Sequence, residues 1–275
     1  MRPIRVLTLN VWNRSGPWEA RLEAIRRGIR ALDPDLVALQ EVLHAESMPE
    51  IPGQHLAIAE GLGYHTAYAP SWELAGVGFG NAILSRWPIR AQQELALPAP
   101  VGPPSQGAWT LLFAEIEAPF GVVPFFATHL AWRLHEGALR REQVLSIATH
   151  VARLSPVARD AFPAILAGDF NAEPDADEIR FLKGLATLDG RSIYFADCFG
   201  VAGTGPGVTF SKRNTFAALE REPERRIDYV FVRGPDELGR GQPLLAQVCL
   251  DAPVDGVFPS DHFGVLATIR VDEDA

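Results

Sequence analysis

Residues 166–175 read LAGDFNAEPD, and this stretch places polar side chains directly after an apolar run. Successive residues of a strand point to opposite faces of a sheet. Asp169 and Asn171, two positions apart, are therefore expected to face the same way, with Phe170 packed behind them. We expect Pro174 to prevent the strand from continuing. The stretch predicts a buried strand that aims an acid and an amide at one point.

The same arrangement recurs along the chain, because five further apolar segments carry a carboxylate, an amide or an imidazole at one end. In α/β sheets, ligands bind outside strand ends, where rigid elements present side chains from distant parts of the sequence. We therefore expect these polar residues to form one site. Beside 166–175, the segments are VLTLN with Asn10, LVALQE with Glu41, VVPFFATH with His129, RIDYVFV with Asp228, and PSDHFGVLATI with Asp261 and His262.

Hydrophobic periodicity predicts an α/β chain with mixed sheets and helices outside them. A strand at 5–11, a helix at 18–32 and a strand at 35–42 form a unit that returns to the same sheet. No repeat, low-complexity tract or change of composition divides the chain, so we expect one domain over 1–275. Further strands are expected at 64–68, 81–85, 111–116, 123–128, 163–168, 226–232, 246–250 and 263–271, helices at 136–154 and 176–185, and long loops at 97–107 and 199–226.

The composition is that of a folded chain, with 275 residues, an apolar fraction of 47% and a formal net charge of -9. The negative charge disfavours tight, nonspecific nucleic-acid binding, which depends on neutralised phosphates. The two cysteines form no disulfide framework, and the sequence has no visible signal peptide or membrane-spanning segment. We expect a cytoplasmic protein, with a secreted form that has lost its leader as the alternative.

The polar side chains at the strand ends are oxygen-rich and free of thiols, which suits a hard cation such as Mg²⁺, Mn²⁺ or Ca²⁺. A metal ion stabilises the charge that develops when water attacks a phosphate ester, and a carboxylate or histidine deprotonates that water. Taken singly, an Asp or Asn at a strand end is usually a turn former. The occurrence of compatible side chains at several strand ends favours the chemical interpretation.

The ordered set of motifs resembles the endonuclease/exonuclease/phosphatase superfamily over nearly the whole chain, from residue 8 to residue 266. GDFN together with a terminal SDH is fairly specific, and the full ordered set is a strong signal. The motifs are TLN with Asn10, LQE with Glu41, GNAILS with Asn81, THL with His129, GDFNAEP with Asp169 and Asn171, RIDYVFV with Asp228, and SDHFGVL with Asp261 and His262.

The resemblance implies a four-layer α/β/β/α sandwich of the DNase I-like type, in which two mixed β-sheets are flanked by helices. It also implies hydrolysis of a phosphate ester that depends on Mg²⁺, Mn²⁺ or Ca²⁺. Carried over to this sequence, the residues of the metal site are Asn10, Glu41 and Asp261. Among the catalytic residues, Asp169 handles a proton and Asn171 holds the phosphate. His262 lies against the scissile phosphate, and Asp228 fixes the tautomer of His262. His129 is a second phosphate ligand or a general acid.

Departures from two branches of the superfamily narrow the choice. Glu41 is followed by Val42 and Leu43 rather than by the lysine typical of the abasic-site repair branch. The segment PERRIDY stands where inositol polyphosphate phosphatases carry a PxWCDR stretch. His129 resembles the branches with two active-site histidines, which include secreted-type deoxyribonucleases and sphingomyelinase-like phosphodiesterases. Outer substrate contacts are expected from Asn81, Arg133 and Lys212.

We therefore expect a monomeric phosphodiesterase that acts on a nucleic acid, a phospholipid headgroup or a small phosphodiester, without stable insertion into a membrane. A phosphomonoesterase acting on a sugar or lipid-headgroup phosphate is the alternative within enzymes. A catalytically silent scaffold of the same fold is the alternative from another class. The scaffold is disfavoured because every expected catalytic position holds the expected chemistry.

Overall fold

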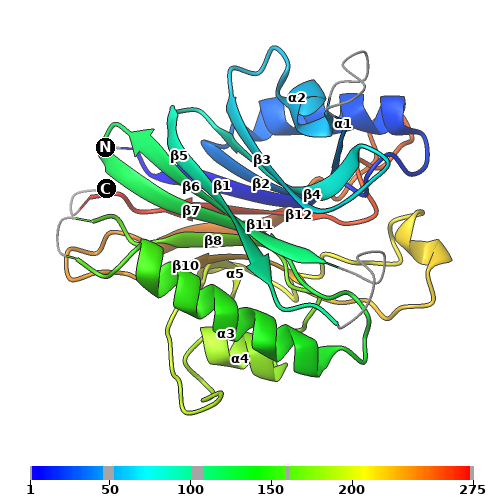
Figure 1. Ribbon diagram of the computed structural model, residues 1–275. Coiled ribbons are helices and arrows are strands. Elements are labelled where there is room, and N and C mark those ends of the chain that lie inside the picture. The colour runs from blue at the N-terminus through cyan, green and yellow to red at the C-terminus, as the bar shows by residue number, and fades with distance from the viewer. Residues whose placement is uncertain (1, 46–52, 101–107, 159–160, 273–275) are drawn as a thin grey trace.

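Two six-stranded β-sheets pack face to face, and helices cover the outer face of each sheet (Figure 1). The computed structural model describes residues 2–45, 53–100, 108–158 and 161–272. Each sheet contains one parallel pair of strands among antiparallel neighbours, so both sheets are mixed. The predicted four-layer α/β/β/α sandwich is confirmed.

The sheets take strands from both halves of the chain. The first sheet has the order β11 (Pro243–Cys249), β12 (Gly264–Ile269), β1 (Ile4–Asn10), β2 (Leu36–His44), β4 (Val77–Ser85), β3 (His65–Leu74). The second has the order β5 (Ile89–Leu97), β6 (Trp109–Ala118), β7 (Gly121–His129), β8 (Ile165–Asp169), β10 (Asp228–Val232), β9 (Ala196–Asp197). The helices are α1 (Trp18–Leu32), α2 (Gln54–Ala59), α3 (Gly137–Leu154), α4 (Asp177–Leu182), α5 (Cys198–Ala202) and the 3-10 helix η2 (Ala217–Leu219).

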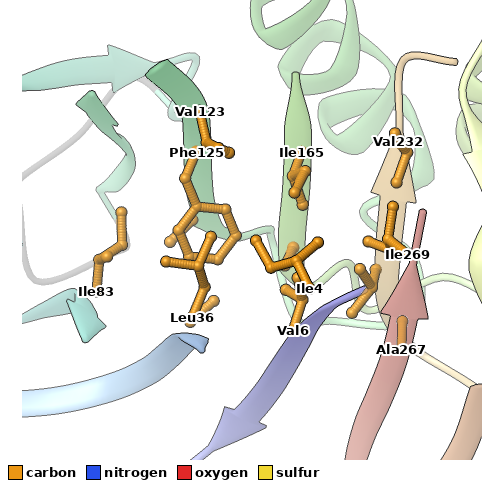
Figure 2. Close-up of a cluster of buried hydrophobic side chains, with 14 of the residues drawn as sticks. Ile4, Val6, Leu36, Ile83, Val123, Phe125, Ile165, Val232, Ala267 and Ile269 are labelled. Carbon is orange, nitrogen blue, oxygen red and sulfur yellow. The ribbon is translucent and has the colours of Figure 1, made fainter. Parts of the chain in front are cut away.

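The main apolar core fills the space between the two sheets (Figure 2). Ile4 and Val6 of β1 lie there together with Phe125 of β7 and Ile165 of β8, and all four are essentially free of solvent contact. These residues alternate along their strands with side chains that point to the outer faces, as the period of two requires.

The outer face of each sheet packs against a helix. Helix α1 presents Ile25 and Ile29 to the first sheet, where they join Leu7 of β1 in one buried cluster. Helix α3 packs on the second sheet, and its Val144 lies in a cluster with Leu166 of β8. Every strand of the central pairs β1–β2 and β7–β8 is therefore buried on both faces, which explains their continuous apolar sequences.

Several elements escaped the sequence prediction. Strand β5 was not expected, because its central residues 90–94 are exposed and, apart from Ala91, polar, and they lie at the edge of the second sheet. The segment 199–226, predicted as a loop, contains most of α5 and all of η2. Residues 101–107 of the predicted loop 97–107 lie outside the described residues. Leu97, the first residue of that predicted loop, is the last residue of β5.

The described ends of the chain lie at one end of the sandwich, since Ile4 pairs with Ile269 across β1 and β12 (Figure 1). Asn10 lies at the other end of β1. Cys198 and Cys249 are free and buried in different clusters. Among the described helices, none combines the length and the apolar character required to cross a lipid bilayer.

Candidate active site

The side chains between the sheets change from apolar to polar at the end of the sandwich that holds Asn10. In β8, Ile165 belongs to the inter-sheet core, and Asp169 follows four positions later in the same alternating row. In β7, Phe125 and His129 are related in the same way. His129 and Asp169 are direct neighbours in the parallel register of the two strands. The strand period thus carries both functional groups to one place.

Gly168 allows β8 to lie close against β7. A Cβ atom at this position would lie 2.0 Å from the carbonyl oxygen of Thr128, and the backbone has φ +156°. Strand β8 ends at Asp169, and Phe170 packs edge-to-face on Tyr229 with ring centroids 5.5 Å apart. Asn171 adopts φ +50°, so this left-handed turn, and not Pro174 as predicted, ends the strand.

Asp169 lies at the centre of the polar cluster. Its Oδ1 accepts a hydrogen bond of 2.9 Å from the backbone N–H of Asn171, which is the local role of a turn-forming acid. Its Oδ2 faces the other way, accepts a 3.1 Å bond from Asn10 Nδ2, and lies 3.6 Å from His129 Nε2 and 3.8 Å from His262 Nε2. One oxygen therefore holds the turn while the other faces two imidazoles.

Glu41 reaches the site through a β-bulge. The register between β2 and β4 shifts between Leu39 and Val42, and Glu41 has φ +57°, a strained conformation for a residue with a side chain. Strand β2 continues to His44, so Glu41 lies within the strand and not at its end as predicted. Its carboxylate accepts hydrogen bonds from Asn10 Nδ2 at 3.1 Å and from Asn13 Nδ2 at 3.2 Å.

His262 is held by a buried carboxylate. Its Nδ1 lies 3.0 Å from Asp228 Oδ2, which leaves Nε2 directed toward Asp169. The hydroxyl of Thr209 accepts hydrogen bonds from the backbone N–H groups of Ile227 and Asp228, and this fixes the start of β10. Among the described residues, Asp228 Oδ1 has no hydrogen-bond partner.

The charge state of His262 follows from its surroundings. Burial alone lowers the pKa of His262, but the carboxylates of Asp228 and Asp169 outweigh this effect and raise the pKa well above its ordinary value. The ring is therefore expected to carry a positive charge at neutral pH. A buried imidazolium between two carboxylates is suited to stabilising an anionic phosphate beside it.

His129 has a different partner. Asn171 Nδ2 donates a 3.2 Å hydrogen bond to the carbonyl of Leu130, which fixes the orientation of the amide. The same nitrogen lies 3.1 Å from His129 Nε2, so the imidazole nitrogen acts as the acceptor in this arrangement. His129 and Asn171 therefore form a second pair beside Asp169 in its own sheet, whereas Asn10 approaches Asp169 from the other sheet.

The loop before β12 is anchored to the first sheet and to the segment before η2. Ser260 Oγ donates a 2.6 Å hydrogen bond to the carbonyl of Asn10 and lies 3.1 Å from Asp261 Oδ1. Asn214 Nδ2 donates to the carbonyls of Ser260 and Asp261, at 2.7 and 3.1 Å. Burial raises the pKa of Asp261 to about 7; His262 opposes this effect and the carboxylate of Glu41 adds to it.

The donor set fits a hard divalent cation. The carboxylates of Glu41, Asp169 and Asp261 share one cleft, and among the described residues no lysine or arginine forms an ion pair with them. Burial and, to a lesser degree, the carboxylate of Glu41 raise the pKa of Asp261, and a bound cation would offset both effects. Asn10 Oδ1 accepts a 2.9 Å bond from the backbone N–H of Trp12, so the amide nitrogen, not the oxygen, faces the carboxylates.

Asp169 also belongs to a second set of potential ligand atoms, together with Asp228 and His262. Asp169, Asp228 and His262 each offer one such atom, and the three atoms lie within 4.8 Å of one another. Asp228 is already bonded to His262. This bond favours an acid–base role for the trio and leaves Glu41 and Asp261 as the ligands on the wall of the cleft.

A cleft of about 550 Å³ is lined by Glu41, His129, Asp169, Asn171, Asp261 and His262. The wall of the cleft contains aromatic rings, carboxylates and two arginines. Each arginine forms an ion pair with a carboxylate, Arg133 with Glu136 and Arg225 with Glu222. The aromatic side chains of the wall are Trp12, Trp72, Phe79, Trp109, Trp132 and Phe210, and its carboxylates are Glu41, Asp169, Glu220, Glu222 and Asp261.

The three predicted substrate contacts have different positions. Arg133 lines the cleft, with its guanidinium over the Trp132 ring at 4.9 Å from the ring centroid. Asn81 is fully buried away from the cleft wall, and its Nδ2 donates a 2.8 Å bond to the carbonyl of Thr110. Lys212 is exposed and is not part of the described cleft wall.

Sequence reasoning missed the residues that support the site. Asn13, Thr209 and Asn214 are polar residues in or beside loops, and nothing in their local pattern distinguishes them from ordinary turn residues. Ser260 stands inside the SDH motif, which is a signal that its hydroxyl has a specific partner.

A sequence profile described as the Endonuclease/Exonuclease/phosphatase family matches residues 7–262. The chain is 28% identical over 179 residues to an uncharacterised protein of Escherichia coli, YbhP; the match covers 61% of this chain and 66% of that protein, just under two thirds of its length.

Solved structures share the fold. The crystal structure of an endonuclease/exonuclease/phosphatase from Beutenbergia cavernae matches with a TM-score of 0.73 and 26% identity, covering 98% of this chain and 72% of that one. An endonuclease/exonuclease/phosphatase from Bacteroides vulgatus matches with a TM-score of 0.73 and 21% identity, covering 98% of this chain and 99% of that one.

Proposed function

The chain belongs to the endonuclease/exonuclease/phosphatase family, and from this premise we propose that it is a divalent-metal-dependent phosphodiesterase. Enzymes of this family typically hydrolyse phosphoester bonds with a metal ion. The observation that carries the proposal is the contact of Asp228 with His262 and of His262 with Asp169, beside a cleft that also contains the carboxylates of Glu41 and Asp261.

Glu41 and Asp261 would hold Mg²⁺ or Mn²⁺, with Asn10 keeping Glu41 close to Asp169 through its amide nitrogen. The bound metal supplies a Lewis acid that polarises the phosphate and offsets its charge. This assignment keeps Glu41 and Asp261 in their predicted roles. It changes the role of Asn10 from a ligand to a support of the ligands.

The remaining residues divide the chemistry between them. Asp169 Oδ2 accepts a proton from the attacking water. The imidazolium of His262 stabilises the negative charge that grows on the phosphate, and Asp228 holds the ring in place. His129 and Asn171 would contact a phosphate oxygen beside Asp169, with that oxygen taking the place of His129 Nε2 as the acceptor of the second Asn171 N–H.

The charges of the cleft favour a phosphodiester over a phosphomonoester. A monoester carries close to two negative charges at neutral pH, because its second pKa is about 6, whereas a diester carries one. Both arginines of the described cleft wall are already paired with carboxylates, and five acids line the same wall. A second charge on the substrate would therefore meet little compensation beyond the metal and His262.

The aromatic wall favours a substrate with apolar or planar groups next to the phosphate. Trp132 is half exposed at the cleft, although large aromatic side chains are usually covered. A small phosphodiester fits this environment better than a long polyanion, whose further phosphates would meet Glu220 and Glu222.

The test is a comparison of two chromogenic substrates at fixed Mn²⁺ and salt. We expect hydrolysis of bis(p-nitrophenyl) phosphate to exceed that of p-nitrophenyl phosphate by at least about tenfold in kcat/KM, and chelation to stop both reactions. Faster cleavage of the monoester would favour the phosphomonoesterase. Hydrolysis of neither substrate above the metal blank would favour the silent scaffold. A panel of plasmid DNA, RNA and a choline phospholipid then separates the substrate classes.

We further propose that the protein is active as a monomer and that it acts in a reducing compartment. Both cysteines are free thiols, which is the usual state in a reducing compartment. Sedimentation of the active protein tests the monomer.

A further inference from the structure

Arg21 of helix α1 is charged and yet buried to 0% exposure, because it lies on the same helix face as the buried Trp18 and Ile25. A guanidinium has five N–H donors. In Arg21 every donor reaches a backbone carbonyl: Nε bonds Ser15 at 3.0 Å, Nη1 bonds Val11 at 2.8 Å and Pro259 at 3.1 Å, and Nη2 bonds Trp12 at 3.2 Å and Asn13 at 2.7 Å.

The partners of Arg21 belong to two segments that are far apart in the sequence. Four carbonyls come from residues 11–15, which follow β1, and the fifth comes from Pro259, which precedes the SDH motif. Arg21 also contacts the rings of Trp12 and Trp18, at 5.0 and 5.4 Å from their centroids. The side chain thus connects two loops that enter the site from different strands.

The first loop needs such support because of its backbone. Trp12 has φ +54° and Asn13 has φ +39°, so two consecutive residues with side chains adopt the left-handed conformation. Such residues persist only where the surroundings hold them. Arg21 binds both of their carbonyls, and Gln54 Nε2 donates a further 2.8 Å bond to the carbonyl of Asn13.

Each loop is connected to a carboxylate of the cleft. The Asn13 side chain donates a 3.2 Å bond to Glu41 Oε2, so the position of its backbone sets the position of that bond. Pro259 is followed by Ser260 and then by Asp261, whose Oδ1 lies 3.1 Å from the Ser260 hydroxyl. Arg21 is therefore connected to each carboxylate through one loop and forms no hydrogen bond with either carboxylate.

We propose that Arg21 is a positioning residue that sets the separation of Glu41 and Asp261 for a divalent cation, an inference that rests on the proposed metal-dependent function. Arg21 acts through the two loops and contacts neither metal nor substrate. A lysine would keep the charge but supplies three donors from a single atom, so it cannot hold both loops. Groups that orient metal ligands commonly change metal affinity by about 10–100-fold when removed.

Arg140 provides a matched control. It is also a buried arginine of a helix, and it bonds the carbonyls of Ala131 and Arg133 and the carboxylate of Glu178. None of these partners leads to Glu41 or Asp261. Arg140→Lys should therefore cost stability, as Arg21→Lys does, without changing the affinity for the cation.

The experiment measures the Kd of Mn²⁺ by isothermal titration calorimetry on the full, metal-stripped chain, together with chemical unfolding in the absence of metal. We expect Arg21→Lys and Arg21→Gln each to raise the Kd by about 10–100-fold, and Arg140→Lys to leave it within about twofold of wild type. Turnover of the diester by Arg21→Lys should recover at saturating Mn²⁺, with an unchanged KM for the diester.

Asn13→Ala keeps the test valid where the arginine variants fail to fold. It retains the backbone carbonyl that Arg21 binds and removes the link to Glu41, so we expect it to weaken Mn²⁺ binding by about tenfold. If the folded Arg21→Lys variant or the Asn13→Ala variant binds Mn²⁺ with the Kd of the wild type, the positioning role is overturned and the metal-dependent function stands. A wild-type chain that binds no Mn²⁺ overturns both.

Discussion

His262 Nδ1 lies 3.0 Å from Asp228 Oδ2, and both side chains are buried at the end of the inter-sheet core. Asp228 is absent from the described cleft wall, whereas His262 is part of it. The carboxylate can therefore influence a substrate only through the ring that it orients and charges. The effects of removing the two groups should accordingly be coupled.

Asp228→Asn should reduce kcat by about 10²–10⁴-fold, and the double variant with His262→Ala should be no more than about threefold worse than His262→Ala alone. The double variant lacks the imidazole of His262, so the side chain at position 228 has no ring to orient and its replacement adds little further loss. Steady-state kinetics with a chromogenic diester measures both losses. Asp197→Asn is the control, because Asp197 is a buried carboxylate of the neighbouring strand that pairs with Arg226 outside the site. Additive losses in the double variant would show that Asp228 acts independently of His262.

Glu41→Gln should lower metal-dependent turnover by about 10³-fold or more while leaving the fold intact. The replacement keeps the size of the side chain and one oxygen for either Asn10 or Asn13, but it removes the second acceptor and the charge that a divalent cation requires. Turnover as a function of Mg²⁺ and Mn²⁺, after treatment with a chelator, measures the effect, and circular dichroism reports the fold. Glu60→Gln on the exposed surface is the control. Turnover within a factor of about three of wild type would remove Glu41 from the metal site.

The local alternation of residues allowed part of this site to be predicted. In β8 the apolar residues and Asp169 belong to one strand, so the period of two determines which face Asp169 shares with Ile165. His129 and Asp228 likewise continue the inward row of their own strands, at the strand ends where they were expected from the sequence. No knowledge of distant residues was required at these positions.

Features that depend on distant contacts were beyond such reasoning. Glu41 faces the cleft because a bulge against β4 changes the direction of β2, and the partner strand lies some forty residues later. Arg21 is polar in the sequence yet fully buried, because Pro259 and the loop after β1 surround it. Strand β5 shows no apolar alternation in its centre, since an edge strand pairs by its backbone and exposes its side chains.

Gly168→Ala should destabilise the fold by about 3 kcal/mol or more. A methyl group at this position meets the Thr128 carbonyl at 2.0 Å, so β7 and β8 must separate and His129 must move away from Asp169. Urea unfolding measures the loss. Gly121→Ala is the control, because Gly121 also has a positive φ, +125°, but has no atom within 4 Å of the added carbon among the described residues. A loss at position 168 no larger than that at position 121 would show that backbone strain, not the contact with Thr128, sets the cost.

His55 should make the stability of the fold depend on pH in a defined window. Its ring is buried, stacks on Tyr68 at 5.1 Å between centroids, and has a buried Nδ1 without a hydrogen-bond partner among the described residues. Burial lowers the pKa of His55 to about 4, and the neighbouring His44 adds to the effect. Between pH 6.5 and 4 the unfolded chain therefore takes up a proton that the folded chain does not, so the free energy of unfolding falls as the pH falls.

His55→Phe removes this proton uptake and keeps a ring against Tyr68. We expect the wild type to lose about 2 kcal/mol more than the variant between about pH 7 and pH 5, and the difference to level off below about pH 4. Urea unfolding at a series of pH values measures both curves. His65→Phe is the control, because His65 is exposed and its ring is hydrated in the folded and the unfolded chain alike. Parallel curves for the wild type and His55→Phe over that range would show that the buried imidazole takes up its proton without unfolding.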